Sequence, residues 1–466
     1  HALAQAISRS PLLGELWVTH PENPGLAALG KPVDVPVGIR EIYRLDQFCG
    51  HKKIGLIVIG PEDPLAEGYA DKLAGPGRLI FGPRAEGAKL EADKAWAKQL
   101  MRAASVPTGD ARIFTDPEGA RQYLETRAAD DPVLQGFLEE VSRFRDPADR
   151  RKFTEIEVHK RRDVRLAYHA PRPDLPVIKA SGLAKGKGVI LPSTLAEAIR
   201  AVDDIMVRRV FGEAGRTLLL EERLAGPEVS VLAITDGKTI LVLPPCQDHK
   251  RLGDNDTGPN TGGMGAFCPS PALDDETMSL IERDVLVPIV DALRRDDIDY
   301  RGVIYAGLML TPGGPKVLEF NCRFGDPECQ PLMARVRGDL LELMSLTAQG
   351  RLDEARIDWA PEHACCVVLA SRGYPDKPAL DVPITGVEDA EKMPGVVVNY
   401  AGVKRRADGT LVTAGGRVLG VTGLGATLEE ARARAYDACE KIRFEGKTLR
   451  TDIGAPRAVG TRKVRL

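Results

Sequence analysis

Short apolar runs alternate with helix-like stretches through the first hundred residues, and this alternation restricts the possible folds more than any other feature. The runs and the helix-like stretches are, in chain order, Leu16–Val18, Ile54–Ile59, Leu65–Ala74, Arg78–Phe81 and Ala85–Leu90. Strands that alternate with helices favour βα units with parallel pairing. Ligands bind at the carboxyl ends of parallel strands, so the turn Gly60–Pro64 would lie at such an end. Taken alone, an ordinary βα turn explains this stretch better than a binding loop.

Antiparallel signals follow further along the chain. Val177–Lys179 and Thr217–Leu220 are predicted strands, and Val229–Val242 and Val303–Asn321 are predicted hairpins, the first with its turn at Asp236-Gly237. A final αβ unit is predicted from strands and one helix near Cys365–Ala370, Val396–Tyr400, Val418–Thr422 and Thr427–Ile442. The chain is therefore expected to be a multidomain protein of the α/β and α+β classes.

Size and charge favour a multidomain protein that acts on small molecules. The chain has 466 residues, which at roughly 150 residues per domain suggests about three domains. Its net charge of -3 gives no basis for binding nucleic acid or an anionic membrane. No apolar run approaches the roughly 18 residues that span a bilayer, and the first residues lack the pattern of a signal peptide. A cytoplasmic location is expected. The eight cysteines form no CxxC pair and are expected to be reduced thiols.

The segment from about Thr126 to Pro176 is crowded with charges of both signs and has little clean periodicity. We expect a surface insertion with a solvated face and assign it no chemistry. The charges include Arg143, Arg145, Asp146, Arg150, Arg151, Lys152, Arg161, Arg162 and Arg165.

A glycine and lysine loop follows the strand that contains Lys179. Gly182, Gly186 and Gly188 alternate with Lys185 and Lys187, so backbone N–H groups and ammonium groups could surround phosphates. Gly188 stands where a Walker A loop needs Ser or Thr, which disfavours a P-loop fold. A Gly/Lys turn without a ligand remains the alternative.

The next candidate is Leu218–Ser230, where an apolar strand runs into acidic residues. The strand leads to Glu221 and Glu222, and Glu228 follows after a turn. Such a segment could offer backbone groups to a purine edge and a carboxylate to ribose hydroxyls. Surface acids at a strand end are the alternative.

Lys316–Glu328 has the pattern of a metal-binding strand. Strand alternation places Glu319 and Asn321 on one face beside Arg323, with Leu318 and Phe320 on the other. Two oxygen ligands suit Mg²⁺, which completes its coordination with phosphates and water. Arg323 could neutralise a phosphoryl group or bind a carboxylate. Glu and Asn satisfied by neighbouring backbone groups are the alternative.

The stretch Cys246–Phe267 fits neither a helical nor a strand repeat. It contains five glycines: Gly253, Gly258, Gly262, Gly263 and Gly265. A glycine-rich composition favours tight turns and close approach to a ligand.

Together these stretches resemble ATP-grasp enzymes, and in particular the phosphoribosylamine-glycine ligase family, also called glycinamide ribonucleotide synthetases. The resemblance covers nearly the whole chain. The matching motifs are Gly60–Leu65, Lys179–Val189, Gln247–Arg251, Asp256–Gly265, Glu319–Glu328 and Thr413–Leu419. Two departures stand out. The family usually opens with a strand and a loop ending in Gly-Gly-Arg-Glu-His-Ala-Leu, whereas this chain begins at His1-Ala-Leu3, so the first strand is expected to be missing. The charged segment is longer than the family's usual link and is interpreted as an insertion.

The resemblance implies an ATP-grasp fold with a parallel-sheet βα domain at the N-terminus and an αβ domain at the C-terminus. The expected boundaries are 1–93 for the N-terminal substrate domain, 94–225 for a lid subdomain with the charged insertion at about 126–176, 226–355 for the ATP-grasp core, and 356–466 for the C-terminal domain.

The resemblance also implies a reaction: glycine is joined to 5-phosphoribosylamine with ATP and Mg²⁺ or Mn²⁺, through a glycyl phosphate, in de novo purine synthesis. Catalytic roles are expected for Arg323, Lys250 and Asp248, and metal binding for Glu319 and Asn321. Residues expected at ATP are Lys179, Gly182, Lys187, Gly188, Glu221, Glu222, Leu224 and Glu228, with Lys185 either a further phosphate contact or solvated. Residues expected at the other substrates are Pro61, Glu62, Asp248, Lys250, Arg251, Asn260, Thr261, Gly262, Gly263 and Met264.

Two other functions fit parts of the sequence. A carboxylase-type or peptide-forming ATP-grasp ligase would share the lid and the metal strand but should lack the Gln247–Gly265 stretch. A non-catalytic nucleotide-binding protein would tolerate the loss of Glu319, Asn321 or Arg323, all of which are present. No nucleic acid or membrane partner is expected. The protein is expected to be a monomer or a weak dimer.

Overall fold

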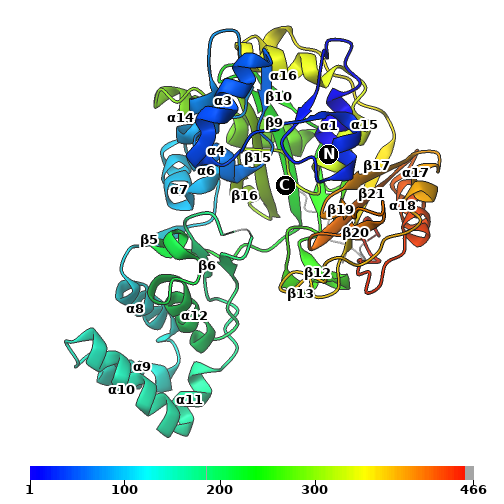
Figure 1. The fold of residues 1–466 in the computed structure, drawn as a ribbon. Helices are drawn as coiled ribbons and strands as arrows, with labels where there is room; N and C mark the ends of the chain where they lie inside the picture. The colour runs from blue at the N-terminus through cyan, green and yellow to red at the C-terminus, as the bar shows by residue number, and fades with distance from the viewer. Residues whose placement is uncertain (185, 457–466) are drawn as a thin grey trace. The chain divides into compact units, whose positions relative to one another are not determined.

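The computed structural model describes residues 1–184 and 186–456, and these form two compact units (Figure 1). The larger unit contains His1–Lys89, Ala103–Pro107 and the chain from Gly226 onward. The smaller unit contains Leu90–Arg102 and Thr108–Ala225. Each is described by itself. Lys185 lies outside the described residues, so its expected role has no structural counterpart here.

The N-terminal part of the larger unit confirms the predicted βα pattern. Strands β1 and β2 pair in parallel, as do β3 and β4, where Leu56 lies opposite Leu79. The elements are α1 (Ala2–Ile7), β1 (Trp17–Val18), α2 (Pro24–Leu29), β2 (Lys31–Pro32), α3 (Ile42–His51), β3 (Leu56–Val58), α4 (Glu62–Ala66), α5 (Tyr69–Leu73), β4 (Leu79–Phe81) and α6 (Ala85–Ala92).

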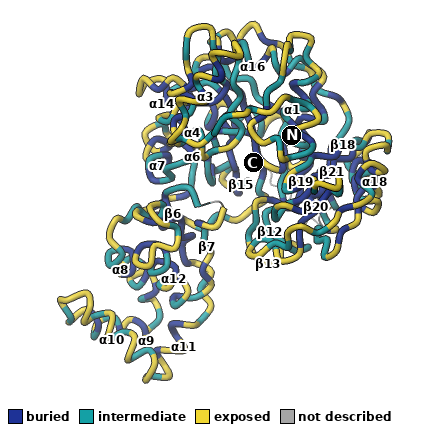
Figure 2. Tube along the Cα trace, in the orientation of Figure 1, coloured by how far each residue is buried: buried dark blue, intermediate teal, exposed yellow. Residues whose placement is uncertain are grey.

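The centre of the larger unit is an antiparallel sheet in the order β10-β9-β15-β16. Both predicted hairpins are confirmed in it: β9 (Glu228–Thr235) with β10 (Ile240–Val242), and β15 (Gly302–Thr311) with β16 (Gly314–Asn321). The two central strands, β9 and β15, are largely buried, whereas β10 and most of β16 are half-buried; Figure 2 shows β15 in the buried interior. The helices that follow these strands are α13 (Asp275–Ile281), α14 (Val287–Arg295), α15 (Cys329–Arg335) and α16 (Leu340–Gln349).

A second sheet of the larger unit has the order β11-β14-β17-β21-β18. Its C-terminal strands are β17 (His363–Ala370), β18 (Val396–Tyr400) and β21 (Arg417–Gly425), and α18 (Leu428–Lys441) packs against them. The other C-terminal elements are α17 (Val387–Glu391), β19 (Val403–Arg405) and β20 (Leu411–Thr413).

The prediction that Cys246–Phe267 contains no regular structure was wrong. It forms β11 (Gln247–Asp248), β12 (Arg251–Gly253), β13 (Thr257–Asn260) and β14 (Gly265–Cys268). Strands of two to four residues are too short to show a repeat in sequence. Two of them pair within the second sheet, since β14 lies between β11 and β17.

The smaller unit is built on an antiparallel sheet in the order β5-β8-β6-β7. Its strands are β5 (Ala111–Phe114), β6 (Val177–Ala180), β7 (Val189–Ile190) and β8 (Leu218–Glu221), with α7 (Lys94–Ala103), α8 (Pro117–Ala128) and α12 (Leu195–Val202) around them. The predicted strands Val177–Lys179 and Thr217–Leu220 are confirmed as β6 and β8.

The charged segment is not an aperiodic excursion, and that expectation was wrong. It forms α9 (Pro132–Val141), α10 (Pro147–Lys160) and α11 (Arg162–Tyr168). Asp131 and Asp146 each cap a helix whose first residue is Pro, an arrangement that favours helix initiation. Side chains such as Phe137 and Tyr168 enter a core shared with the sheet. The expectation of a solvated face holds for α10, which buries no residue.

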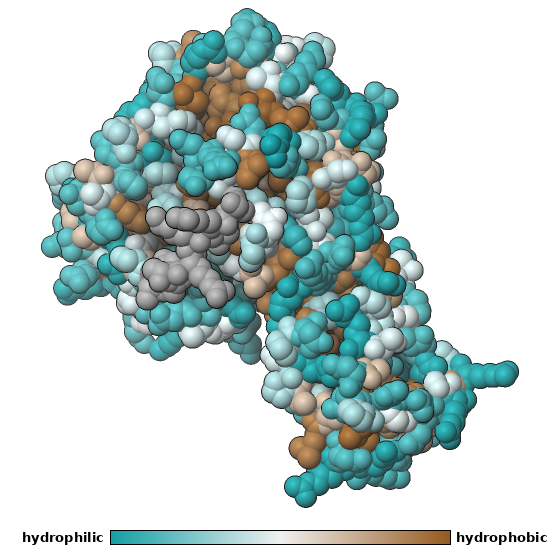
Figure 3. Space-filling view, turned by 180° about the vertical axis from the view of Figure 1, so that it is seen from behind, coloured by the Kyte–Doolittle hydropathy of each residue, from teal (hydrophilic) through white to brown (hydrophobic). Residues whose placement is uncertain are grey.

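The state of the cysteines agrees with the expectation of reduced thiols. All eight cysteines are free and buried. Among the described residues, no helix is long and apolar enough to cross a membrane. Figure 3 shows hydrophilic side chains over much of one face, including the part formed by α9–α11, and a patch of hydrophobic residues on the upper part of the larger unit.

Candidate active site

Two lysines of the smaller unit share one buried carboxylate. The Glu221 carboxylate accepts from Lys98 Nζ at 3.0 Å and from Lys179 Nζ at 2.9 Å. The exposed fractions of the three side chains are 2% for Lys98, 2% for Glu221 and 8% for Lys179. Glu221, which was predicted to lie at the nucleotide, therefore fixes the position of Lys179, the predicted phosphate-binding lysine.

The sequence interpretation missed Lys98. It lies on the buried stripe of α7 with Ala95 and Met101, a helical spacing in which a lysine stands out among apolar residues. Its ammonium also donates to Thr108 Oγ1 at 2.6 Å. Burial lowers the pKa of Lys98 to about 8, although the adjacent Glu221 opposes this shift.

The glycine and lysine loop closes the hairpin between β6 and β7, in which Lys179 lies opposite Val189. Two of its glycines are required by packing. A Cβ at Gly182 would lie 2.6 Å from the Cα of Ala214, and one at Gly188 would lie 2.7 Å from the Cβ of Ala184. Lys187 is exposed at the end of the loop.

The predicted nucleotide residues after β8 lie in both units. Glu222 is exposed beside Asp110, whose N–H donates to Glu222 Oε2 at 3.2 Å, and Leu224 is half-buried. Glu228 begins β9 in the larger unit, where its carboxylate accepts from Lys250 Nζ.

The predicted metal ligands lie at the end of β16. The pairing of β15 with β16 shifts by one residue, because Gly307 lies opposite Glu319 but Leu308 lies opposite Val317. Leu318 is therefore the extra residue of a bulge. Val317 and Phe320 are buried, while Glu319 and Asn321 are only half-buried. The two oxygen-bearing side chains thus share the less buried face, as predicted.

An acidic cluster surrounds Lys250. Its ammonium contacts Glu228 and lies 3.6 Å from Glu319 Oε1. Burial alone would lower the pKa of Lys250, but the carboxylates of Glu228, Asp248 and Glu319 raise it well above its usual value. Burial raises the pKa of Asp248 well above its usual range, and the neighbouring glutamates add to this shift. Carboxylates outnumber the single ammonium, so the cluster attracts cations.

A buried hydrogen-bond network beside this cluster was missed from sequence. Tyr305 Oη lies 2.8 Å from Ser230 Oγ and donates to Glu328 Oε1 at 2.8 Å. Glu328 is 3% exposed. The Glu319–Glu328 motif contains this residue, but its partners on β9 and β15 are distant in sequence.

Arg323 lies beside the acidic cluster and next to the predicted βα turn. Its Nε contacts Glu62 Oε2 at 3.2 Å, and its Nη2 lies 3.5 Å from Asn321 Oδ1. Pro61 caps α4, whose first residue is Glu62. The Gly60–Leu65 and Glu319–Glu328 motifs therefore meet in space, although more than 250 residues separate them in the chain.

The remaining predicted substrate residues lie on the β12–β13 hairpin and directly after it. Arg251 pairs with Asn260, and its Nη1 donates to the carbonyl oxygen of Gly258 at 2.8 Å. Thr261 Oγ1 donates to the carbonyl oxygen of Lys250 at 2.9 Å, which joins the hairpin to the acidic cluster.

Three residues after the hairpin hold the chain close to its neighbours. Gly262 N–H donates to Tyr374 Oη at 2.9 Å. Gly263 has φ +107°, and a Cβ there would lie 2.4 Å from Pro327 Cδ, so glycine is required. Met264 is fully buried.

The oxygen-rich end of β16 fits a hard divalent cation. Among residues 1–184 and 186–456, no group of three or more His, Cys, Asp or Glu side chains is arranged to hold a metal ion. Glu319 and Asn321 alone provide two oxygen ligands, which is the number that Mg²⁺ takes when phosphates and water complete its shell. The acidic cluster supplies the excess negative charge that such an ion requires.

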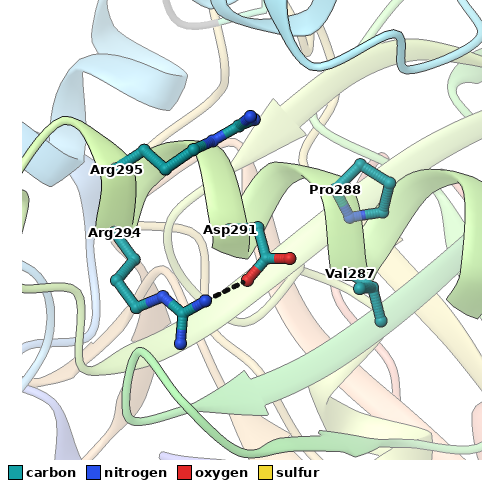
Figure 4. A pocket seen from close by; sticks show the side chains of 5 residues that line it. All are labelled: Val287, Pro288, Asp291, Arg294 and Arg295. Carbon is teal, nitrogen blue, oxygen red and sulfur yellow. Dashed lines mark hydrogen bonds and ion pairs between the residues drawn. The ribbon is translucent and has the colours of Figure 1, made fainter.

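A surface pocket lies away from these residues, on α14 (Figure 4). Its volume is about 290 Å³, and Arg294 contacts Asp291 at 2.9 Å within it. None of the predicted site residues lines it. The lining residues are Val287, Pro288, Asp291, Arg294 and Arg295.

Comparison with known proteins identifies the family. Models of phosphoribosylglycinamide synthetase match the N domain at residues 1–91, the ATP-grasp (A) domain at 151–329 and the C domain at 364–456. The phosphoribosylamine-glycine ligase of Rhodopirellula baltica is 44% identical over 454 residues, which cover 97% of this chain and 94% of that protein. A trifunctional purine biosynthetic protein of Homo sapiens is 40% identical, with 97% of this chain matching 40% of that longer protein.

Solved structures agree with this assignment. The phosphoribosylamine-glycine ligase of Thermotoga maritima superposes with a TM-score of 0.74 at 30% identity and covers 97% of both chains. A biotin carboxylase of Campylobacter jejuni, at 14% identity and a TM-score of 0.64, shares the fold. The predicted multidomain ATP-grasp fold is confirmed, and the chain belongs to the phosphoribosylamine-glycine ligase family of ATP-dependent ligases.

Proposed function

We propose that this chain performs the family reaction through a glycyl phosphate, using the residues described above. Glycine and 5-phosphoribosylamine are joined at the expense of ATP, and the products are glycinamide ribonucleotide, ADP and phosphate. The supporting observation is the end of β16, where Glu319, Asn321 and Arg323 lie beside the Lys250 cluster.

The chemistry requires no protein nucleophile. A carboxylate is a poor electrophile, so the glycine carboxylate first attacks the γ-phosphorus of ATP, and the bond between that phosphorus and the β,γ-bridging oxygen breaks to release ADP. The amine of phosphoribosylamine then attacks the acyl carbon, loses a proton, and phosphate leaves. Catalysis is therefore positioning and charge stabilisation.

The strand end and the acidic cluster divide these tasks in the larger unit. Glu319 and Asn321 would hold Mg²⁺ or Mn²⁺, which neutralises phosphate charge when bound. Arg323 binds an anionic oxygen, either of the glycine carboxylate or of the transferring phosphoryl group. Asp248 offers its carboxyl oxygens to the ammonium group of glycine, and the ammonium group of Lys250, which contacts Glu228, offsets part of the negative charge around it.

The remaining predicted residues bind the larger substrates. Arg251, Asn260, Thr261, Gly262, Gly263 and Met264, together with Pro61 and Glu62, form the surface for the sugar phosphate. Lys179, Lys187, Gly182 and Gly188 bind ATP phosphates, and Glu221, Glu222, Leu224 and Glu228 complete the nucleotide site. We place the enzyme in the cytoplasm, acting as a monomer or weak dimer without nucleic acid or membrane.

The deciding experiment is ADP release with Mg²⁺-ATP, glycine and phosphoribosylamine generated in situ, with each component omitted in turn. Release is expected to need all three and to fall about a hundredfold or more in Glu319→Ala, because a ligand of the cation that would neutralise the phosphate charge is lost. Glu354→Ala is the control, since that glutamate pairs with Arg351 on the surface. Release that ignores glycine but responds to another carboxylate would overturn the substrate assignment.

A further inference from the structure

A segment near the end of the described chain exchanges hydrogen bonds with the turn of the β12–β13 hairpin. The segment is Arg450–Asp452, and the turn is Asp254–Asp256, about 200 residues earlier. The N–H of Thr451 donates to Asp254 Oδ1 at 2.8 Å, and the N–H of Asn255 donates to Asp452 Oδ2 at 2.9 Å. In Figure 1 the hairpin lies beside the red end of the chain.

Arg450 is the centre of this contact. Its side chain is fully buried, and its Nε and Nη2 donate to the two carboxylate oxygens of Asp452, each at 2.7 Å. Its Nη1 donates to Asp256 Oδ1 at 2.9 Å and to the backbone carbonyl oxygen of Arg251 at 3.2 Å. A bidentate guanidinium fixes direction as well as distance, which a lysine does not.

The hairpin needs this external support. Its strands have only three and four residues, and Thr257, Gly258 and Pro259 are exposed, so it buries little surface of its own. A two-stranded hairpin by itself is only marginally stable in water. Its turn also contains Asn255 at φ +56° and Asp256 at φ +54°, which are left-handed conformations that non-glycine residues adopt at a cost. Neighbouring contacts must maintain such a turn.

We propose that Arg450 is a positioning residue for the sugar-phosphate substrate, because it holds the backbone of Arg251 and the turn of the hairpin in one place. This inference rests on the proposed function, in which Arg251 and Asn260 contact that substrate. Arg450 contacts no reacting atom. The far end of the hairpin is held independently, since Arg417 Nη1 donates to the carbonyl oxygen of Gly262 at 2.7 Å.

The test compares three variants of the full-length enzyme. Arg450→Met keeps the volume of the side chain and removes its donors, and Arg450→Lys restores one charge. Arg432→Met is the matched control, because Arg432 donates to the carbonyl oxygens of Thr451 at 2.6 Å and Ile453 at 3.1 Å and, among the described residues, does not donate to the hairpin. It therefore removes support from the same segment without releasing the turn directly.

Two readouts are needed. Hydrogen exchange without substrates tests the contact itself: the amide of Asn255 is expected to exchange at least about tenfold faster in Arg450→Met, since exchange follows local opening. Kinetics test its consequence: KM for phosphoribosylamine is expected to rise about 10- to 100-fold while KM for ATP changes by less than about twofold, because the misplaced groups face one substrate. Arg450→Lys should lie between wild type and Arg450→Met in both.

The outcomes separate this inference from the proposed function. If wild type does not consume ATP in response to glycine and phosphoribosylamine, the proposed function has failed. If wild type is active and Arg450→Met shows unchanged exchange, or equal increases in both KM values, the positioning role is refuted. An Arg432→Met variant that reproduces the selective rise in KM would refute it too, since general loosening of the segment would then suffice. If Arg450→Met does not fold, an Arg450→Lys variant with wild-type KM values would also refute the positioning role.

Discussion

Replacing Glu221 by glutamine tests whether one buried carboxylate balances two lysines in the smaller unit. The change keeps the shape of the side chain and removes its charge. Lys98 and Lys179 lie 3.0 and 2.9 Å from this carboxylate, and all three side chains are at most 8% exposed, so water offers little replacement. Removing one partner of a buried ion pair costs about 3–5 kcal/mol, and we expect a loss of unfolding free energy in that range.

The assay must report on the smaller unit alone, because a chain with two compact units need not unfold in a single step. Of the three tryptophans, only Trp96 belongs to the smaller unit. A background with Trp17→Phe and Trp359→Phe leaves Trp96 fluorescence as the reporter of urea denaturation.

The matched control is Glu222→Gln, the same change at the next residue, whose side chain is exposed. Surface substitutions of this kind alter stability by about 0.5 kcal/mol or less. If Glu221→Gln and Glu222→Gln unfold at the same urea concentration, the two lysines do not depend on Glu221 for charge balance. A double-mutant cycle with Lys98→Met then measures the coupling directly.

Three further predictions follow from the two units. Burial lowers the pKa of Lys98 to about 8, so the unfolded chain binds this proton up to higher pH than the folded chain does. The free energy of unfolding of the smaller unit should therefore rise between about pH 8 and 10. Urea titrations at about pH 7.5 and 9.5 measure this rise, and Lys98→Met should remove it. Glu319→Gln should raise the Mg²⁺ concentration for half-maximal ADP release about tenfold or more, and unchanged Mg²⁺ dependence would exclude it as a ligand. Gly263→Ala should lower the free energy of unfolding of the larger unit by about 1–3 kcal/mol through strain and a clash with Pro327, as measured by urea denaturation in a Trp96→Phe background, where Trp17 and Trp359 of that unit report. Gly258→Ala, also at positive φ but with its nearest neighbour 3.6 Å away, should cost less in that assay.

The local elements were predictable from sequence because their signals are local. The hairpin turn at Asp236-Gly237, the alternation that places Glu319 and Asn321 on one face, and the parallel pairing of β3 with β4 all follow from spacing or turn chemistry over a few residues. The long motifs identified the family for the same reason, since each is continuous in sequence.

Two expectations failed where local signals are weak. The charged segment folds into helices because its capping aspartates and a few buried apolar residues stabilise them despite its charge. The interpretation from composition relied on the charge alone. The strands of the glycine-rich stretch exist because their partners are available: β14 pairs with β17, about 100 residues later.

The sequence by itself determined which chemical groups are present and which local conformations they favour. The tertiary structure decided which of those groups meet. Lys98 reaches Glu221, Arg323 reaches Glu62, and Arg450 reaches Asp256, each across a separation that no periodic pattern encodes. The physical reason is that these contacts depend on the pairing of strands distant in the chain and on burial. A buried charge without a partner costs free energy, so it pairs with the opposite charge that the fold brings near.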